Sequence, residues 1–545
     1  MFNNLLGRGS RDLSSEDLLN GLLAIYAALF EVLAEDLLGR IGRLRTKSGR
    51  VVETPLFLPV INPVTQDIPA RWMKENLGAE AVITNAYIIS KRLREEALSR
   101  GVHGLLDFDG VIMTDSGGYQ VLEYGDVEAT PEDIANLQED IGSDIAVPLD
   151  IPTGMSSREK AEETVKKTLN NLKITLDVLA KRGEKRALWT GPIQGGIHID
   201  LLKQCAKAES EMGFDLFALG SPTPLMEGYQ FEKLFKMLYS VRITIGFGKP
   251  LHLFGAGHPM IFPFIVALGA DMFDSASYYL YAKDDRYLTE SGTLKVDKLD
   301  YLPCYCPICS RTDAKEFREL ERQERVQRLA MHNLYVCFEE LKRIKQAIKD
   351  GRLMELLEIR ARAHPNLYQG FVEIMRNEEL LEVMEQHTPI SSRRGMNLYD
   401  KLSLRRPKVL TARRKLLENY FMRKRHSRIA LLLPNTLKLS IEKAARLGTE
   451  SEILFYGTPF GLIPFSLRYS YPFSQTNYPK SLIEDCLQDL IEIAMSQMMV
   501  AGYEKIYLVK AKSKQLNFFV GEFIERLKRA GIEVEVVGDL KDLLS

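Results

Sequence analysis

The chain has 545 residues, of which 45% are hydrophobic and 27% charged, and its formal net charge is −1. This length excludes a single domain and predicts about two to four, and the composition is that of an ordinary globular protein. Six cysteines in so long a chain exclude a disulfide scaffold and favour a reducing, cytoplasmic compartment. No apolar run approaches the roughly 20 residues of a membrane span, and no signal peptide is recognised, so we expect no membrane association.

Residues 1–30 are the first predicted part of the chain, an N-terminal extension. Leu18–Val32 is apolar but is interrupted by Asn20, Gly21 and Glu31. The pattern predicts an extra amphipathic helix, and nothing in the sequence indicates its purpose.

From about Glu31 to Asp274, short apolar runs alternate with charged, helical segments such as Ser157–Lys181 and Ile199–Met212. This alternation predicts a parallel sheet covered by helices, and eight strands in about 250 residues indicate a TIM-like (β/α)8 barrel. A doubly wound sheet would carry a glycine fingerprint after its first strand, and none is present. The expected strands are Leu56–Ile61, Ala81–Thr84, Val111–Thr114, Ile145–Leu149, Ala187–Ile193, Leu216–Leu219, Leu251–Phe254 and Met272–Phe273.

Polar residues follow the carboxyl ends of these strands, which share one face of a barrel and would therefore meet in one pocket. The stretch from Asp115 to Gln120 offers a carboxylate, a hydroxyl, bare backbone N–H groups and an aromatic face, a set suited to gripping a purine. Taken alone, it is more simply a strand followed by an Asp-Ser-Gly-Gly turn. The other polar residues at strand ends are Asp150, Gln194, Gly220, Ser221, His258 and Asp274. Two acids flanking a glycosidic carbon can perform a double displacement.

A cysteine cluster follows the predicted barrel. Cys304, Cys306 and Cys309, with His332 in the next helical stretch, supply three thiolates and an imidazole for one tetrahedral Zn²⁺. A coincidental cluster is the alternative. Four protein ligands leave no open coordination position, so the zinc, one per chain, is interpreted as structural. We expect the remaining cysteines to be small core residues: Cys205, Cys337 and Cys486.

The chain then changes in composition. Ala314–Arg352 predicts charged helices with an apolar stripe that packs on the barrel. Ser391–Arg428 is rich in Lys and Arg. A run of charged residues is usually a solvent-exposed face. So many positive charges in a chain of near-zero net charge, however, suggest contact with a phosphate backbone. From Ile429 onward, strands and helices, among them a helix over Lys480–Val500, predict a small α/β domain, in which Tyr456–Tyr478 is either a surface loop or a binding edge. The predicted parts are an extension over 1–30, a barrel with zinc site over 31–360, a helical and basic segment over 361–428, and an α/β domain over 429–545.

Four ordered motifs between about Glu31 and Arg352 resemble the tRNA-guanine transglycosylases. They are Asp115–Gln120, Gln194-Gly195-Gly196, Asp271-Met272-Phe273-Asp274, and the cysteine cluster with His332-Asn333-Leu334. Asp274-Ser275-Ala276-Ser277-Tyr278 and Gly220-Ser221-Pro222-Thr223-Pro224 are similar to the archaeal branch of that family, as is the C-terminal extension.

The resemblance implies a pentosyltransferase that exchanges guanine at tRNA position 15, in the D-arm, for 7-cyano-7-deazaguanine, on the path to archaeosine. It implies that Asp274 attacks C1′ of the guanosine and forms a covalent intermediate, and that Asp115 is the acid/base. The base-binding set it implies is Ser116, Tyr119, Asp150, Gln194, Gly220, Ser221 and Thr223, with Tyr119 stacking on the base. It also implies a cytoplasmic homodimer.

Archaeal members commonly end in an RNA-binding PUA domain, which we do not recognise before Ser545, so a separate PUA-domain protein is an expected partner. Two other functions stay open. One is an archaeosine synthase-like enzyme, although Leu433-Pro434-Asn435 lacks the cysteine of that group's motif. The other is a non-catalytic tRNA-binding subunit, against which the presence of both Asp115 and Asp274 argues.

Overall fold

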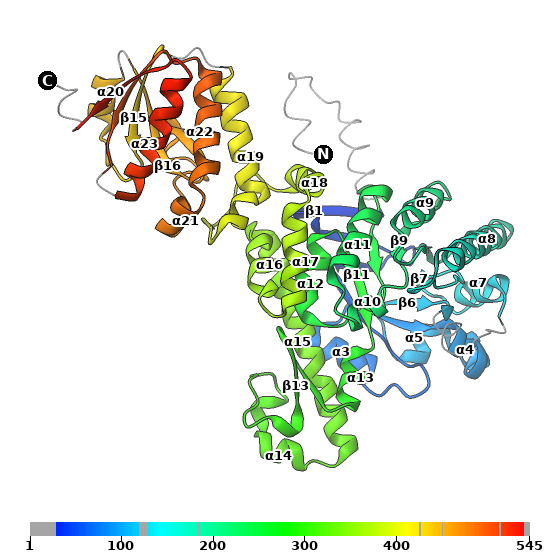
Figure 1. Ribbon diagram of the computed structural model, residues 1–545. Coiled ribbons are helices and arrows are strands. Elements are labelled where there is room, and N and C mark those ends of the chain that lie inside the picture. The colour runs from blue at the N-terminus through cyan, green and yellow to red at the C-terminus, as the bar shows by residue number, and fades with distance from the viewer. Residues whose placement is uncertain are drawn as a thin grey trace, which may run out of the picture. The chain divides into compact units, whose positions relative to one another are not determined.

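The computed structural model describes residues 29–118, 129–183, 185–423, 427–448, 451–511 and 514–538 (Figure 1). The chain divides into two compact units, one containing Gly39–Lys345 and the other Glu35–Leu38 with the described residues from Gln346 onward. Most of the predicted N-terminal helix lies outside the described residues. Its last residues, from Phe30 on, belong instead to strand β1 (Phe30–Asp36), which lies in a sheet of order β1-β2-β3 with β2 (Gly39–Arg45) and β3 (Val51–Thr54).

The first unit is built on eight parallel strands in the order β4-β11-β10-β9-β8-β7-β6-β5. A bridge between Val60 and Ile83 joins the two outermost strands and closes the barrel. The predicted (β/α)8 architecture and each of its strands are therefore confirmed. The strands are β4 (Leu56–Pro59), β5 (Ala81–Asn85), β6 (Val111–Asp115), β7 (Ile145–Ala146), β8 (Leu188–Ile193), β9 (Leu216–Leu219), β10 (Leu251–Leu253) and β11 (Met272–Ser275).

Helices surround these strands on the outside (Figure 1). They are α3 (Ala70–Leu77), α4 (Ala86–Arg92), α5 (Arg94–Leu106), α7 (Pro131–Asp140), α8 (Arg158–Arg182), α9 (Ile199–Ser210), α10 (Thr223–Glu227), α11 (Phe231–Ile245), α12 (Phe262–Ala267) and α13 (Ser277–Lys283). A lobe follows the barrel, made of the hairpin β12 (Arg286–Thr289) and β13 (Gly292–Lys295), helix α14 (Ala314–Glu319) and helix α15 (Arg322–Asp350).

Side chains alternate along each strand, and this alternation decides which residues face the barrel interior. Met113 of β6 and Met272 of β11 belong to one buried cluster, to which Leu44 and Val52 of the hairpin β2–β3 also contribute. Asp115 lies two residues beyond Met113, and Asp274 lies two residues beyond Met272, so both point to the same interior. The apolar pattern that fills the barrel thus also places two carboxylates at its carboxyl-end mouth.

Asp271, just before β11, anchors the opposite end of the barrel. Its carboxylate accepts hydrogen bonds from Arg40 Nε (2.9 Å) and Nη2 (2.6 Å), from Arg242 Nη1 (3.2 Å) and from the Leu251 amide (2.8 Å). None of the three charged side chains is more than 2% exposed. Because Arg40 lies in β2, Asp271 ties the hairpin to the amino ends of the barrel strands.

We expect Asp271→Asn to destabilise the barrel by about 3–5 kcal/mol, because it leaves two buried guanidinium groups without a countercharge. A thermal or urea unfolding curve measures the effect. Glu75→Ala is the control, since it removes the exposed pair Arg71–Glu75 and should leave the curve unchanged. Equal curves for Asp271→Asn and the wild type would contradict this account.

The second unit combines helices with a five-stranded sheet. The helices α16 (Leu353–Ala361), α17 (Pro365–Arg376) and α18 (Glu378–His387) precede α19 (Pro407–Lys415). The sheet has the order β17-β16-β15-β19-β20 and is parallel except for β17, as predicted for an α/β domain. Its strands are β15 (Ile429–Pro434), β16 (Glu452–Thr458), β17 (Gly461–Pro464), β19 (Lys505–Val509) and β20 (Glu533–Val537), and its helices are α20 (Ile441–Leu447), α21 (Lys480–Asp485), α22 (Leu487–Ala501) and α23 (Lys514–Arg529).

Two details differ from or refine the sequence-based expectation. The segment Tyr456–Tyr478 contains β17, an antiparallel edge strand, so part of it is a sheet edge rather than a loop. The single helix predicted over Lys480–Val500 is two helices that meet at Cys486, whose backbone is not helical (φ −114°, ψ 17°). Among the described helices, none is both long and apolar enough to cross a bilayer.

Candidate active site and metal centre

Three carboxylates meet at the carboxyl ends of the barrel strands. Asp115 ends β6, Asp150 follows β7, and Asp274 lies in β11. Burial, with the negative charges of Asp150 and then Asp274, raises the pKa of Asp115 to about 7. Burial likewise raises the pKa of Asp150 to about 6. Asp115 is therefore close to half-protonated at neutral pH, which suits a group that must both donate and accept a proton.

Asp274 is held through one of its two oxygens. Oδ1 lies 2.7 Å from Nε2 of His252 and accepts a hydrogen bond of 3.2 Å from the Gly255 amide. None of the described residues donates a hydrogen bond to Oδ2. The side chain is 10% exposed, so it is close-packed yet accessible at the barrel mouth. One oxygen is fixed and the other is available to an electrophilic carbon, an arrangement that suits a nucleophile.

Gln194 organises the neighbouring part of the site. Its Nε2 donates to Asp150 Oδ2 (2.6 Å), and its Oε1 accepts from the Thr153 amide (3.1 Å) and from Ser221 Oγ (2.9 Å). These three bonds fix the orientation of the amide. Ser116 Oγ donates to the other oxygen of Asp150 at 3.4 Å. The result is a rigid row of donors and acceptors that can hydrogen-bond the edge of a planar base.

Two glycines allow this row to pack so closely. A Cβ added at Gly118 would lie 2.5 Å from Asp150 Oδ1, and one added at Gly220 would lie 2.1 Å from Gln194 Nε2. No other residue fits at either position without displacing the polar group. The predicted residues Ser116, Gly220 and Ser221 therefore lie beside Asp150 and Gln194.

Two other predicted site residues lie elsewhere. Thr223 begins α10, and its Oγ1 would be 2.5 Å from a Cβ added at Gly255, so it lies beside the loop that holds Asp274. His258 uses Nδ1 to accept the Met260 amide, which caps a short 3-10 helix, and burial lowers the pKa of His258 to about 4. It is therefore a neutral backbone cap. Tyr119 lies outside the described residues.

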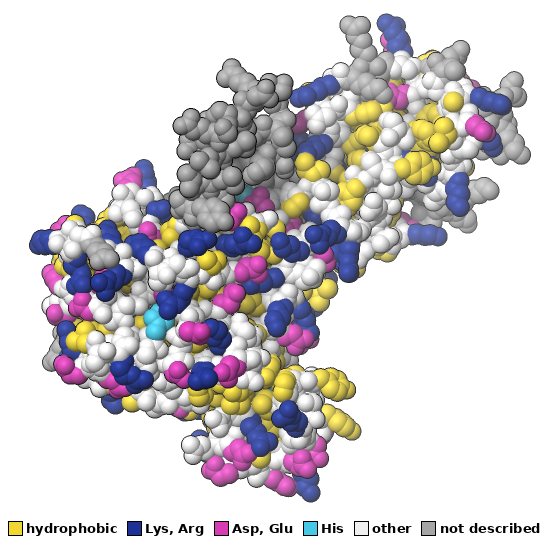
Figure 2. Space-filling model, turned by 180° about the vertical axis from the view of Figure 1, so that it is seen from behind, with side chains coloured by type: hydrophobic (Ala, Val, Ile, Leu, Met, Phe, Trp, Pro, Cys, Tyr) yellow, Lys and Arg dark blue, Asp and Glu magenta, His cyan; other side chains and the backbone are white. Residues whose placement is uncertain are grey.

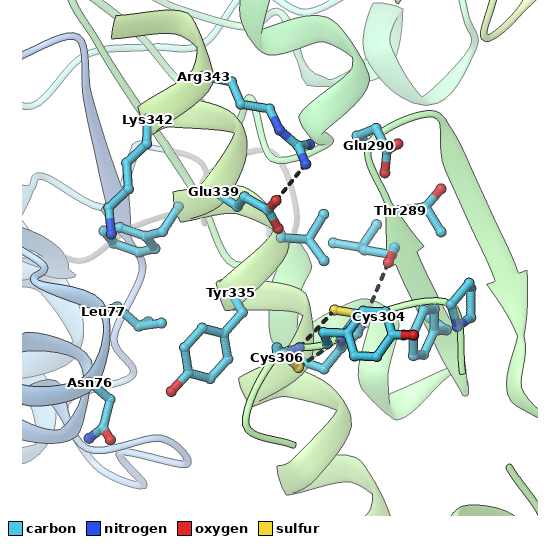
Figure 3. A pocket seen from close by; sticks show the side chains of 17 residues that line it. Asn76, Leu77, Thr289, Glu290, Cys304, Cys306, Tyr335, Glu339, Lys342 and Arg343 are labelled. Atoms are coloured by element: carbon cyan, nitrogen blue, oxygen red, sulfur yellow. Dashed lines mark hydrogen bonds and ion pairs between the residues drawn. The ribbon is translucent and has the colours of Figure 1, made fainter. Parts of the chain in front are cut away.

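The four predicted metal ligands come together in the lobe after the barrel. The ligand atoms of Cys304, Cys306, Cys309 and His332 all lie within 4.8 Å of one another. Cys304, Cys306 and His332 border a cavity of about 530 Å³, at one end of which Cys304 and Cys306 lie side by side (Figure 3). Tyr335 points into the same space, and Glu339 faces Arg343 further along α15 (Figure 3).

The donor set fits a tetrahedral metal ion. His332 Nδ1 lies 3.5 Å from Cys306 Sγ and 3.3 Å from Cys309 Sγ. Metal bonds of about 2.3 Å to sulfur and about 2.05 Å to nitrogen at tetrahedral angles would place these atoms roughly 3.6 Å apart. His332 Nε2 faces the Leu288 carbonyl at 2.9 Å, which leaves Nδ1 unprotonated for a metal. The cluster can therefore bind a metal ion. The other three cysteines are buried outside it, as predicted.

Comparison with known proteins identifies the family of the chain. The family described as queuine tRNA-ribosyltransferase matches residues 36–366. The chain belongs to this family. A tRNA-guanine(15) transglycosylase from Archaeoglobus fulgidus is 41% identical over 503 residues, which are 90% of this chain and 97% of the relative. Relatives with the same name from Saccharolobus solfataricus (39% identical, 90% of this chain and 98% of the relative) and Methanosarcina barkeri (42%, 82% and 87%) are similar over nearly as much sequence.

Six basic side chains of the segment Ser391–Arg428 form ion pairs within the second unit. Arg406 is buried and pairs with Glu355 (3.3 Å) and Glu358 (2.5 Å). Further pairs are Arg394–Asp350, Lys401–Asp489, Arg405–Glu378, Arg414–Glu385 and Arg428–Glu504. Lys and Arg side chains are also interleaved with Asp and Glu on the molecular surface (Figure 2). Contact of Ser391–Arg428 with a phosphate backbone stays a prediction. The ion pairs leave fewer of its Lys and Arg side chains free to bind phosphate than the sequence suggested.

His252 is a residue of the site that the sequence analysis did not predict. It lies in the apolar run Leu251–Phe254 and was counted only as part of a strand. Its register gives the missing signal, because His252 is directly opposite Met272, an inward-facing residue. Side chains alternate along a barrel strand, so a polar residue at an inward-facing position points into the barrel or its mouth and not toward the surrounding helices.

Proposed function

We propose that this chain exchanges the guanine at position 15 of the tRNA D-arm for 7-cyano-7-deazaguanine, on the path to archaeosine. The observation that carries the proposal is the meeting of Asp115 and Asp274 at one barrel mouth, where the charge of Asp274 acts on Asp115. Membership of the queuine tRNA-ribosyltransferase family and the relatives named tRNA-guanine(15) transglycosylase support tRNA as the substrate.

In the first step Oδ2 of Asp274 attacks C1′ of the guanosine. The Oδ2–C1′ bond forms as the C1′–N9 bond breaks, and the electron pair of the broken bond leaves with guanine. Asp115, protonated, donates its proton to the departing base. The ribose passes through an oxocarbenium-like transition state flanked by carboxylates, and dividing the substitution into two steps lowers each barrier.

In the second step the incoming base reverses these events. Asp115, now ionised, accepts the N9 proton of 7-cyano-7-deazaguanine, N9 bonds to C1′, and the electron pair of the C1′–Oδ2 bond returns to Asp274. The raised pKa of Asp115 supports both halves of this role, because both of its protonation states are populated near neutral pH. No redox cofactor is needed, since one glycosidic bond replaces another.

The base would be recognised by the row around Gln194. Asp150 can accept hydrogen bonds from the purine N–H edge, and Ser116, Ser221 and Gly220 complete the pocket wall, with Thr223 beside the nucleophile loop. Tyr119 stacks on the base in this proposal. A D-arm guanine has to leave its stack to reach a barrel mouth, which costs a few kcal/mol that RNA contacts outside the pocket would offset.

We assign Zn²⁺, one ion per chain, to the cluster of Cys304, Cys306, Cys309 and His332, with a structural role. Cys306→Ser is expected to weaken metal binding by more than ~100-fold and to lower the melting temperature of the lobe. Metal analysis together with thermal unfolding measures both. Cys486→Ala is the control, because it removes a buried thiol outside the cluster and should keep one ion per chain. A metal-free Cys306→Ser variant that is stable but inactive would contradict the structural role.

Incubation with tRNA and labelled guanine or labelled 7-cyano-7-deazaguanine tests the proposed function. Label should enter the RNA, at position 15 of the D-arm. Intact, metal-loaded protein that incorporates neither base would reject base exchange. The homodimer, the cytoplasmic location and the separate PUA-domain partner remain predictions, and sedimentation with and without tRNA tests the first of them.

A further inference from the structure

His252 is the most deeply buried titratable group in contact with the proposed nucleophile. Its side chain is 0% exposed, and it reaches Asp274 from the neighbouring strand, since β10 pairs with β11. The contact between Nε2 and Asp274 Oδ1 is 2.7 Å long. The ring also packs edge-on against Phe254, with centroids 4.8 Å apart. The imidazole therefore has a single fixed position relative to the carboxylate.

The surroundings of the ring decide which nitrogen carries the proton. Nδ1 is buried and has no hydrogen-bond partner among the described residues. A proton on Nδ1 would thus be a buried donor without an acceptor, which is costly. A proton on Nε2 points directly at a carboxylate oxygen. The geometry therefore places a proton on Nε2 of His252, through which it donates to Asp274.

This donor acts on the same oxygen as the Gly255 amide. With two donors on Oδ1, the carboxylate cannot rotate freely, and Oδ2 is the oxygen directed to C1′. After the covalent bond forms, Oδ1 becomes the carbonyl oxygen of the glycosyl ester and keeps both donors. When the C1′–Oδ2 bond breaks, negative charge returns to the carboxylate, and the two fixed donors stabilise it.

We propose that His252 is a positioning residue, which orients Asp274 for attack and stabilises its carboxylate as the leaving group of the second step. This inference rests on the proposed base exchange and adds a residue to it. It predicts an effect on turnover rather than on tRNA affinity, because His252 is buried behind Asp274 and lies too deep to contact the RNA.

The test compares His252→Leu, which removes the donor at similar volume, with His252→Gln, whose side-chain amide can place an N–H near the position of Nε2. We expect His252→Leu to lower kcat for base exchange by ~10²–10³-fold, as loss of one preorganised donor commonly does. KM for tRNA should change by less than about threefold. His252→Gln should recover at least about tenfold of the lost kcat. Thermal unfolding and metal content are measured on each variant.

Three outcomes would overturn the inference: a folded His252→Leu variant with wild-type kcat, a loss that appears only in KM, or a glutamine variant no better than leucine. If neither variant folds, ¹⁵N NMR of histidine-labelled wild-type protein decides. The His252 signal, identified by its change in Asp274→Asn, should report an Nε2–H tautomer, and a proton on Nδ1 would overturn the proposal. The wild-type protein is assayed in parallel, because absence of base exchange there would reject the proposed function itself. The role of His252 is judged only from the variants when the wild type is active.

Discussion

Asp274→Ala is expected to abolish base exchange, with a loss on the order of 10⁴-fold or more, because removing a covalent nucleophile removes the pathway itself. The denaturant-resistant adduct between protein and tRNA should disappear at the same time. tRNA binding should persist, since the substitution deletes one small side chain at the barrel mouth. Gel electrophoresis under denaturing conditions follows the adduct, and a filter or gel-shift assay follows binding.

Asp297→Ala is the matched control for this experiment. Asp297 is exposed on a short 3-10 helix in the lobe that follows the barrel, so the same substitution there should change neither the adduct nor the exchange rate. An adduct that persists in Asp274→Ala would show that another residue is the nucleophile.

Asp115→Asn should lower the rate of adduct formation by ~10²–10⁴-fold, the usual contribution of a positioned acid/base. Asparagine keeps the size of the side chain and removes only its ability to give or take a proton. Burial makes the ionised form of Asp115 unfavourable in the folded protein. Removing this carboxylate should therefore not lower the melting temperature.

The pH dependence supplies a sharper form of the same prediction. Because the pKa of Asp115 is raised to about 7, the acid is protonated below that pH and ionised above it. Single-turnover release of guanine needs the protonated form, so its rate should fall as the pH rises through about 7. The Asp115→Asn variant should lack this fall. A wild-type rate that increases steadily from pH 6 to 9 would assign the proton to another group.

Much of the fold was predictable because a parallel barrel strand is buried on both faces. Its sequence is therefore a short run of consecutive apolar residues. Leu216–Leu219 is an example, and its predicted and observed bounds agree. The metal cluster was predictable for a different reason, since Cys304, Cys306 and Cys309 lie so close in sequence that only a tight turn can connect them. Asp115 and Asp274 were found because strand ends share one face of a barrel, whatever the sequence distance between them.

Other features depend on contacts that a single sequence does not contain. The role of His252 depends on the register of β10 against β11, which brings its Nε2 to within 2.7 Å of Asp274 Oδ1. The basic run was interpreted as a site for phosphate because its acidic partners lie on other elements, such as Glu355 on α16 and Glu385 on α18. Arg406 is an example: it belongs to a basic run in the sequence, but in the structure it is buried and paired with acidic residues.

The most direct test of the account is to locate the covalent bond. The adduct is trapped with tRNA, digested with nuclease and protease, and the modified peptide is sequenced by mass spectrometry. The ribose should be attached to Asp274. A ribose attached to Asp115 or Asp150, or base exchange that proceeds without any trapped adduct, would contradict the central claim that Asp274 is the nucleophile and Asp115 its proton partner.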